Sequence, residues 1–276
     1  MCIRDRGEEG FVHAEDDVAE AVALEDLDSD GYLDMLIGTY VLDQQLVRYE
    51  WNGTAWDLVW TVDLNYSVAS LDVSDLDEDG VFEIFAGSYK DEAGNYLGNL
   101  TILTPDGTVE AQYGYGTNSI YQIVCGRIYA TPSPATRAVF KQDLDKDGHM
   151  EAILGHYQQV TILEAVGPDT YDFTAFVLSI GYSAYAVELT WDLDNNGKIE
   201  FLYGESYPGN YLRAYEWDGV SDNSYTEVWS MDFGTTVEDV AAASRVLSDL
   251  DGDGYYELAV ALSYYATDEV HILEST

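Results

Sequence analysis

The stretch Asp26-Leu27-Asp28-Ser29-Asp30-Gly31-Tyr32-Leu33-Asp34 decides the fold, because its pattern occurs five times in the 276-residue chain. The later copies begin at Asp75, Asp143, Asp192 and Asp249. Each copy has side-chain oxygens at positions 1, 3, 5 and 9, and a glycine at position 6 that permits a sharp bend. Unrelated acidic turns would not keep one spacing, so the pattern indicates one recurring loop.

Loops of this kind suit a hard divalent cation. Calcium takes six to eight oxygen ligands at roughly 2.3–2.6 Å, and alternating carboxylates on a tight turn supply most of them. Magnesium requires a nearly ideal octahedron and keeps several waters, so calcium is the favoured ion. The sequence therefore predicts up to five bound Ca2+ ions, with the weakest binding at the fourth loop, where Asn196 stands at position 5.

An EF-hand loop begins with the same pattern but needs a bidentate Glu at position 12 and a helix on each side. The residues at position 12 cannot replace that Glu; they are Ile37, Ala86, Leu154, Tyr203 and Val260. A short run rich in β-branched and aromatic residues follows each loop, for example residues 33–40. Such runs are typical of buried strands, so the loops are predicted to join strands.

The pattern Asp-x-Asp-x-Asp-Gly-x-x-Asp/Glu, followed by an apolar strand, resembles the FG-GAP and VCBS repeats of calcium-binding β-propellers, including the blades of the integrin alpha-subunit head. The resemblance implies blades of four antiparallel strands, calcium between the first two strands, an extracellular setting and a role in adhesion or ligand binding. The side-chain ligands that it implies are Asp26, Asp28, Asp30, Asp34, Asp75, Asp77, Asp79, Glu83, Asp143, Asp145, Asp147, Glu151, Asp192, Asp194, Asn196, Glu200, Asp249, Asp251, Asp253 and Glu257. The position-7 carbonyls would come from Tyr32, Val81, His149, Lys198 and Tyr255.

We expect one all-β domain over residues 7–276, a β-propeller of four-stranded antiparallel blades with five calcium-loop repeats. The loops start 49, 68, 49 and 57 residues apart, which matches one blade per repeat. The repeats form either a closed five-bladed ring or a fragment of a larger propeller. Residues 1–6, Met-Cys-Ile-Arg-Asp-Arg, are predicted to be a non-native leader, so an export signal cannot be judged.

The formal net charge of −41, from 52 acidic and 11 basic residues, restricts the partners. Nucleic acids and anionic membranes are excluded, because binding them depends on Lys and Arg. A protein or carbohydrate ligand that is cationic or bridged by calcium fits better. Such acidity suits a high-salt habitat or is incidental in a secreted protein. No stretch is apolar enough to span a membrane, and Cys125 has no intramolecular disulfide partner outside the leader.

The insertion Thr117–Pro134 in the second repeat holds candidate ligand-binding residues, Tyr121, Arg127 and Tyr129. The alternative is an extra hairpin that packs its own aromatic residues. No Gly-x-Ser-x-Gly, His-Glu-x-x-His or phosphate-binding glycine loop is present. The sequence thus favours a non-enzymatic, calcium-stabilised extracellular binding or adhesion module. The alternatives are a polysaccharide lyase or hydrolase, the propeller part of a truncated enzyme, and a passive spacer of a surface protein.

Overall fold

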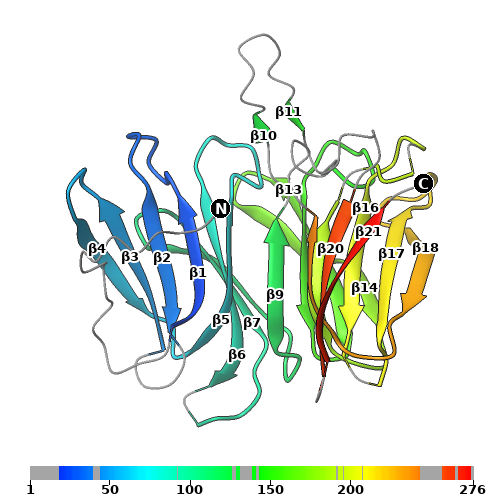
Figure 1. The fold of residues 1–276 in the computed structure, drawn as a ribbon. Coiled ribbons are helices and arrows are strands. Elements are labelled where there is room, and N and C mark those ends of the chain that lie inside the picture. The colour runs from blue at the N-terminus through cyan, green and yellow to red at the C-terminus, as the bar shows by residue number, and fades with distance from the viewer. Residues whose placement is uncertain are drawn as a thin grey trace.

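The computed structural model describes residues 19–39, 44–91, 93–125, 129–130, 139–140, 143–190, 192–194, 196–206, 208–242, 257–264 and 267–274. Within these ranges every regular element is a β-strand, so the all-β prediction is confirmed. Four sheets have four antiparallel strands and one has three, which is consistent with a propeller-like fold (Figure 1). Among the same residues, no helix could cross a membrane.

The strands pair in chain order. The first sheet contains β1 (Ala19–Glu25), β2 (Asp34–Thr39), β3 (Gln45–Trp51) and β4 (Trp56–Asp63). The second contains β5 (Tyr66–Ser74), β6 (Glu83–Asp91), β7 (Asn99–Leu103) and β8 (Val109–Gly114). The third contains β9 (Ile120–Cys125), β12 (Glu151–His156), β13 (Gln159–Gly167) and β14 (Thr170–Ser179). The fourth contains β15 (Ala184–Leu189), β16 (Glu200–Glu205), β17 (Tyr211–Trp217) and β18 (Tyr225–Asp232), and the fifth contains β19 (Val237–Ala242), β20 (Glu257–Tyr264) and β21 (Thr267–Glu274).

The sheets stand side by side like blades. The first strand of each sheet packs against the first strand of the next, in the order β1, β5, β9, β15 and β19. The insertion in the third sheet contributes a short hairpin of β10 (Tyr129–Ala130) and β11 (Val139–Phe140), which projects above the sheets in Figure 1. No closed ring is detected among the described residues, and there the last sheet has only three strands.

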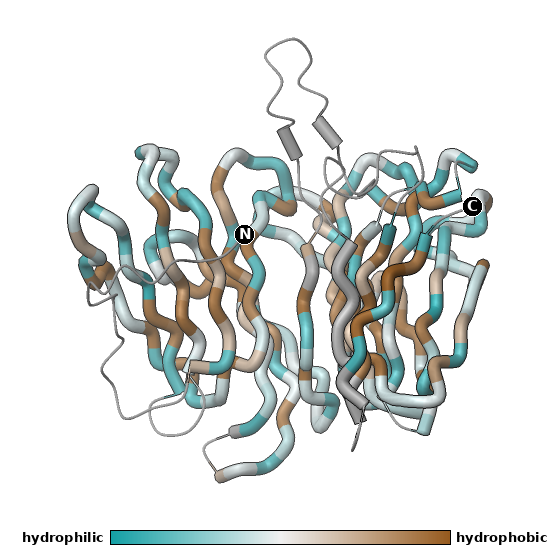
Figure 2. The backbone as a smooth tube through the Cα atoms, viewed as in Figure 1, coloured by the Kyte–Doolittle hydropathy of each residue, from teal (hydrophilic) through white to brown (hydrophobic). Residues whose placement is uncertain are grey.

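The core lies between neighbouring sheets. Four hydrophobic clusters fill these spaces, and one joins Leu36 of β2 to Val68 and Ile84 of the second sheet. Figure 2 shows hydrophobic residues concentrated on the strands and hydrophilic residues on the loops at their ends. The apolar runs that follow the acidic loops are therefore strands buried between sheets, as the sequence predicts.

Glycines on the second strands set how closely the sheets approach. Gly38, Gly87, Gly155 and Gly204 lie against the first strand of the following sheet. A Cβ atom on Gly155 would lie 2.7 Å from the carbonyl oxygen of Ala184 in β15, and that backbone atom cannot move aside easily. The close approach of two backbones therefore requires glycine here.

Replacing Gly155 with alanine tests this packing. We expect Gly155→Ala to lower the free energy of unfolding by about 1–3 kcal/mol, because the added methyl group forces β12 and β15 apart. Urea denaturation measures the effect. The matched control is Gly181→Ala, where the Cβ atom would meet nothing within 4 Å. Equal urea midpoints for Gly155→Ala and Gly181→Ala would contradict this expectation, because they would show that moving the two sheets apart costs no free energy.

Candidate metal centre

Each acidic loop joins the first and second strands of its sheet, and its position-9 acid begins the second strand. These acids are Asp34, Glu83, Glu151, Glu200 and Glu257. In the first four loops the backbone N–H at position 2 donates to the position-9 carboxylate. The donor–acceptor distances are 2.9 Å for Leu27–Asp34, 2.7 Å for Leu76–Glu83, 2.8 Å for Leu144–Glu151 and 2.8 Å for Leu193–Glu200. This bond fixes the carboxylate at the strand end and turns it into the loop.

Two further hydrogen bonds recur inside the loops and close the turn. The N–H of the position-6 glycine donates to the position-1 aspartate, for example from Gly148 to Asp143 at 3.0 Å. The N–H at position 7 donates to the position-5 side chain, for example from His149 to Asp147 at 2.8 Å. Gly148 has a φ of 102°, which favours glycine because other residues rarely adopt it. The acids of one loop are thereby brought around a common centre.

The second and third loops form complete cradles. In each, four carboxylates offer oxygens within 4.8 Å of one another; the sets are Asp75, Asp77, Asp79 and Glu83, and Asp143, Asp145, Asp147 and Glu151. Their burial is uneven, since Glu151 is buried and Asp147 is exposed. This arrangement of only oxygen donors suits calcium better than a transition metal.

Three buried carboxylate oxygens, one each in the second, third and fourth loops, accept no hydrogen bond in the described structure. They are Oδ1 of Asp75, Oε1 of Glu151 and Oδ1 of Asp192. A buried acceptor without a partner is costly, and a buried carboxylate is more costly still. A cation at the centre of the loop would satisfy these atoms, so the second, third and fourth loops fit a bound divalent ion.

Several loop carboxylates have raised pKa values. Burial, with repulsion from neighbouring acids, raises the pKa of Glu83 to about 9 and that of Glu200 to about 8. The same causes raise the pKa of Asp75 and Asp143, mainly through burial. Burial raises each pKa because it penalises the charged form of the carboxyl group.

Turns of the following sheet reach the loops. The N–H of Asp169, between β13 and β14, donates to Oδ2 of Asp77 at 2.6 Å. The N–H of Asn223, between β17 and β18, donates to Oδ2 of Asp145 at 2.7 Å. Both acceptors stand at position 3 of a loop in the preceding sheet. The acidic loops therefore lie at the joints between sheets.

The first loop differs because an arginine is present. Arg48 of β3 is buried, and its Nε donates to Oδ1 of Asp34 at 2.7 Å while an Nη donates to Oδ2 of Asp28 at 3.1 Å. Another Nη donates to the carbonyl of Pro105 in the next sheet at 2.9 Å. The guanidinium group therefore supplies a positive charge at this loop and also links two sheets.

The fourth loop carries its own cation nearby. Lys198 Nζ lies 2.7 Å from Oε1 of Glu216, and Asn196 Nδ2 donates to Oε2 of Glu216 at 2.6 Å. Residues 249–256 of the fifth loop lie outside the described residues, and the predicted ligands Asp249, Asp251, Asp253 and Tyr255 are among them. Glu257 begins β20 and is buried.

Sequence reasoning missed a second row of acids. Glu50, Glu164, Glu216 and Glu274 of the third strands pair directly opposite the position-9 acids. The carboxylate of Glu164 comes within 4.8 Å of ligand atoms of Asp147 and His149. The repeated tripeptide Tyr-Glu-Trp at 49–51 and 215–217 was the available signal.

Of the three predicted ligand-binding residues of the insertion, Tyr121 alone has a described side chain, so how the three are arranged lies outside the described residues. Tyr121 packs in an aromatic cluster, with ring centroids 5.7 Å from Tyr89 and 4.8 Å from Tyr185. Burial raises its pKa to about 12. Arg127 lies outside the described residues, and Tyr129 is placed in β10 without a described side chain.

Comparisons with known proteins match one family model and a large number of solved chains. The family model of the KICSTOR complex protein kaptin matches residues 12–91, which are 80 of the 276 residues. A chain of the Chaetomium thermophilum Polycomb Repressive Complex 2 bound to GSK126 is similar in structure, with a TM-score of 0.58 and 10% identity over 94% of this chain. This chain covers 52% of that one, and the low identity limits the likeness to the fold. No curated protein matches the sequence.

These similarities correct the family prediction. The resemblance to FG-GAP and VCBS repeats and to the integrin alpha-subunit head is wrong, since the family model that matches is that of kaptin. The physical reason is that an acidic nine-residue turn specifies only a loop between two strands. Sheets of different families can carry such a turn, so it does not identify the family.

The predicted extracellular setting and adhesion function are wrong as well. The family model that matches residues 12–91 is that of a KICSTOR complex protein, and not that of a secreted or surface-displayed adhesion module. The prediction that the chain is not an enzyme agrees with the family model that matches residues 12–91, which is that of a complex protein. Both matches are named as parts of multi-protein complexes, and neither name mentions a carbohydrate ligand.

Proposed function

We propose that the chain is a propeller-like protein-interaction scaffold whose sheets are joined by divalent cations. The observation that carries the scaffold function is that the sequence match and the structural neighbour both lead to proteins named as parts of multi-protein complexes. Five sheets held side by side present long loops and strand faces on a rigid base, which suits such a role.

Calcium is the proposed ion at the second, third and fourth loops. The buried oxygens of Asp75, Glu151 and Asp192 that accept no hydrogen bond support this assignment. Because turns of the next sheet contact the second and third loops, a bound ion would hold two sheets together. The loop carboxylates would hold the ion, and the buried side of each loop would keep water away from it.

The five sheets are proposed to be five blades in an open array. Ala261 of β20 stands four residues after Glu257, where the other sheets have their close-contact glycine. A Cβ atom at that place would clash in the other four sheets. The fifth sheet is therefore not built for a neighbour packed in the same manner, which disfavours a closed five-bladed ring.

The partner is proposed to present a basic surface. A net charge of −41 attracts cationic surfaces over roughly 8 Å at physiological salt and repels nucleic acids. Complementary charge increases the rate of encounter and rejects acidic competitors.

Calcium binding is tested with Glu83→Gln and Glu151→Gln. We expect calcium to raise the free energy of unfolding of the wild-type chain by about 1.4 kcal/mol per site at tenfold excess over the dissociation constant, and to raise the melting temperature with it. Each variant should bind one ion fewer by calorimetry. The matched control is Glu78→Gln, which removes the same charge at position 4 of the second loop. The assignment fails if chelator leaves the wild-type melting curve unchanged.

Removing Arg48 tests its role as a fixed cation. We expect Arg48→Met to lower the free energy of unfolding by about 3–5 kcal/mol in chelator, because the buried carboxylate of Asp34 loses its positively charged partner and keeps only the N–H of Leu27. Calcium should restore part of this loss by entering the first loop, raising the ion count by one. Lys198→Met is the control, since Lys198 is more exposed and its loss should cost less. If Arg48→Met and Lys198→Met lower the free energy of unfolding equally in chelator, Arg48 does not act as a fixed cation.

The scaffold function is tested by capture of a partner. A tagged full chain is incubated with extract of its native host, cross-linked, and analysed by mass spectrometry and light scattering. We expect a protein in fixed stoichiometry, and its release at high salt because the attraction is electrostatic. A chain that always elutes alone would contradict the proposal.

A further inference from the structure

The third acidic loop carries a second group of metal ligands beside its ring of four carboxylates. Carboxylate oxygens of Asp147 and Glu164 and a ring nitrogen of His149 lie within 4.8 Å of one another. Asp147 and His149 stand at positions 5 and 7 of the loop, and Glu164 belongs to β13. An imidazole nitrogen with carboxylate oxygens suits zinc and similar transition metals, whereas calcium takes oxygen ligands. These three residues, here called the trio, therefore differ in chemistry from the calcium ring.

The loop and the strand register bring the trio together. The backbone N–H of His149 donates to Oδ1 of Asp147 at 2.8 Å, which folds position 7 back over position 5. Glu164 pairs directly opposite Glu151, so the two side chains lie on the same face of the sheet. Glu151 is 0% exposed and Glu164 is 4% exposed. Two buried carboxylates side by side destabilise the sheet unless a positive charge lies between the loop and β13.

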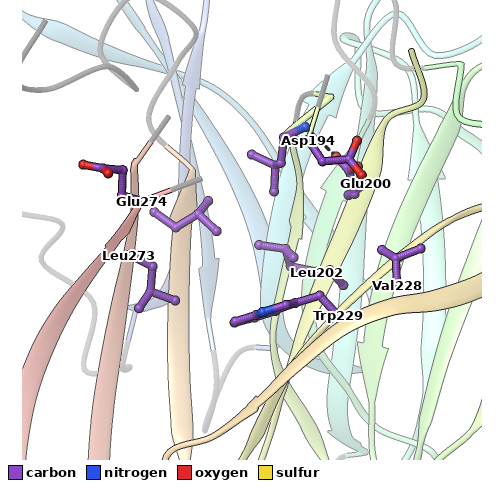
Figure 3. Close-up of a pocket in the computed structure, with 10 residues that line it drawn as sticks. Asp194, Glu200, Leu202, Val228, Trp229, Leu273 and Glu274 are labelled. Atoms are coloured by element: carbon purple, nitrogen blue, oxygen red, sulfur yellow. Dashed lines mark hydrogen bonds between the residues drawn. The ribbon is translucent and has the colours of Figure 1, made fainter. Parts of the chain in front are cut away.

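The fourth sheet shows which group fills the corresponding place there. Asp194 and Glu200 of its loop stand together at the end of a pocket that also includes Leu202 (Figure 3). Lys198, at position 7, places its Nζ 2.7 Å from Oε1 of Glu216, the third-strand acid opposite Glu200. A cation of the chain itself therefore lies between position 7 and the third strand of this sheet.

The first sheet also provides its own cation. Its third-strand acid is Glu50, which pairs opposite Asp34. An Nη of Arg48 lies 3.5 Å from Oε2 of Glu50. In both sheets a positive group of the chain thus compensates the acid that corresponds to Glu164 of the third sheet.

The third sheet has no such group among the described residues. The Nδ2 of Asn223, a neutral amide, donates to Oε2 of Glu164, and no described Lys or Arg pairs with this acid. The imidazole of His149 makes no hydrogen bond or ion pair with Asp147 or Glu164 in the described structure, although its nitrogen lies within 4.8 Å of both oxygens. Ligands that share a metal ion are held apart in this way, because each bonds to the ion and not to the others.

A buried hydroxyl of the next sheet lies at the same cluster. Tyr225, the first residue of β18, is 7% exposed, and its hydroxyl makes no hydrogen bond in the described structure. Burial and the nearby charges of Glu151, Asp145 and Glu164 raise the pKa of this hydroxyl, so it lies beside these acids. A buried hydroxyl without a partner is costly. A water molecule bound to a metal ion at this place would give it one.

We propose that Asp147, His149 and Glu164 bind a transition-metal ion of the zinc class, with water in the remaining position. Asp147 also belongs to the calcium ring, so its two oxygens would serve two neighbouring ions. Position 7 is expected to offer calcium only its backbone carbonyl, which leaves the imidazole for the second ion. The ion would tie the loop to β13. This inference goes beyond the proposed scaffold function and does not depend on it.

The sequence restricts this site to the third loop among the first four. Position 7 is occupied by Tyr32, Val81 and Lys198 in the other three, and none of these side chains has a ring nitrogen. The alternative is that a protonated His149 neutralises the two acids by itself, as Lys198 does for Glu216. Its imidazolium would then donate to an acid, and no such bond is present in the described structure. The metal ion is therefore the favoured occupant.

Zinc binding to the full chain is measured by calorimetry above neutral pH, in saturating calcium so that the acidic loops are already filled. We expect zinc to bind while calcium is retained. His149→Ala and Glu164→Gln should each weaken zinc binding by at least about tenfold, since even outer-shell partners of a metal contribute that much. The matched control is His271→Ala, which removes another imidazole, 3.0 Å from Glu269, and should leave zinc binding unchanged.

Three outcomes would overturn the proposal. The first is zinc affinity that His149→Ala does not change. The second is zinc that releases calcium in equal amount, because zinc would then occupy the calcium ring. The third is an absence of zinc binding, which would leave the protonated imidazole as the cation.

A measurement on the wild-type chain complements the variants. Zinc should shift the nuclear magnetic resonance signals of the His149 ring and leave those of the His271 ring in place. Melting temperatures without zinc show whether each variant is folded. A His149 ring that does not respond to zinc overturns the proposal whether or not the variants fold.

The zinc site and the calcium sites fail separately. His149→Ala should leave the number of bound calcium ions unchanged, whereas Asp147→Asn should weaken the binding of both metals. If the wild-type chain binds no calcium but zinc still requires His149, the zinc site stands and the calcium assignment fails. If calcium binds and zinc ignores His149, the reverse holds. Capture of a protein partner tests the scaffold function independently of both.

Discussion

The second strand of each sheet begins with a buried carboxylate, and the structure depends on how the negative charge of that carboxylate is compensated. Glu151 shows the constraint, because its side chain is fully buried and only one oxygen accepts a hydrogen bond, from the N–H of Leu144. A buried charge costs several kcal/mol unless a positive group or several donors surround it. The short loop cannot provide enough donors by itself, so compensation must come from an ion or from another part of the chain.

The group that compensates the negative charge of the carboxylates differs between loops of nearly the same sequence. Arg48 provides it at the first loop through a guanidinium that contacts Asp28 and Asp34. The second and third loops have no described basic side chain within ion-pairing distance; instead, the backbone of Asp169 and Asn223 donates to a loop acid. Because these donors belong to the following sheet, stabilising a loop also stabilises the contact between two sheets. Repetition of a sequence pattern therefore does not mean that the pattern performs the same chemistry in every repeat.

The local part of this structure could be predicted from sequence. Acids at alternating positions with glycine at position 6 determine the turn, and the apolar run after Asp34 or Glu83 determines a buried strand. The remainder depends on contacts between distant residues. Arg48 lies on a separate strand from the loop that it neutralises, and Asn223 reaches a loop 78 residues away, so no periodicity reveals either. The family and the cellular setting were mispredicted because the inference used the loops, which are local, and not the strands around them.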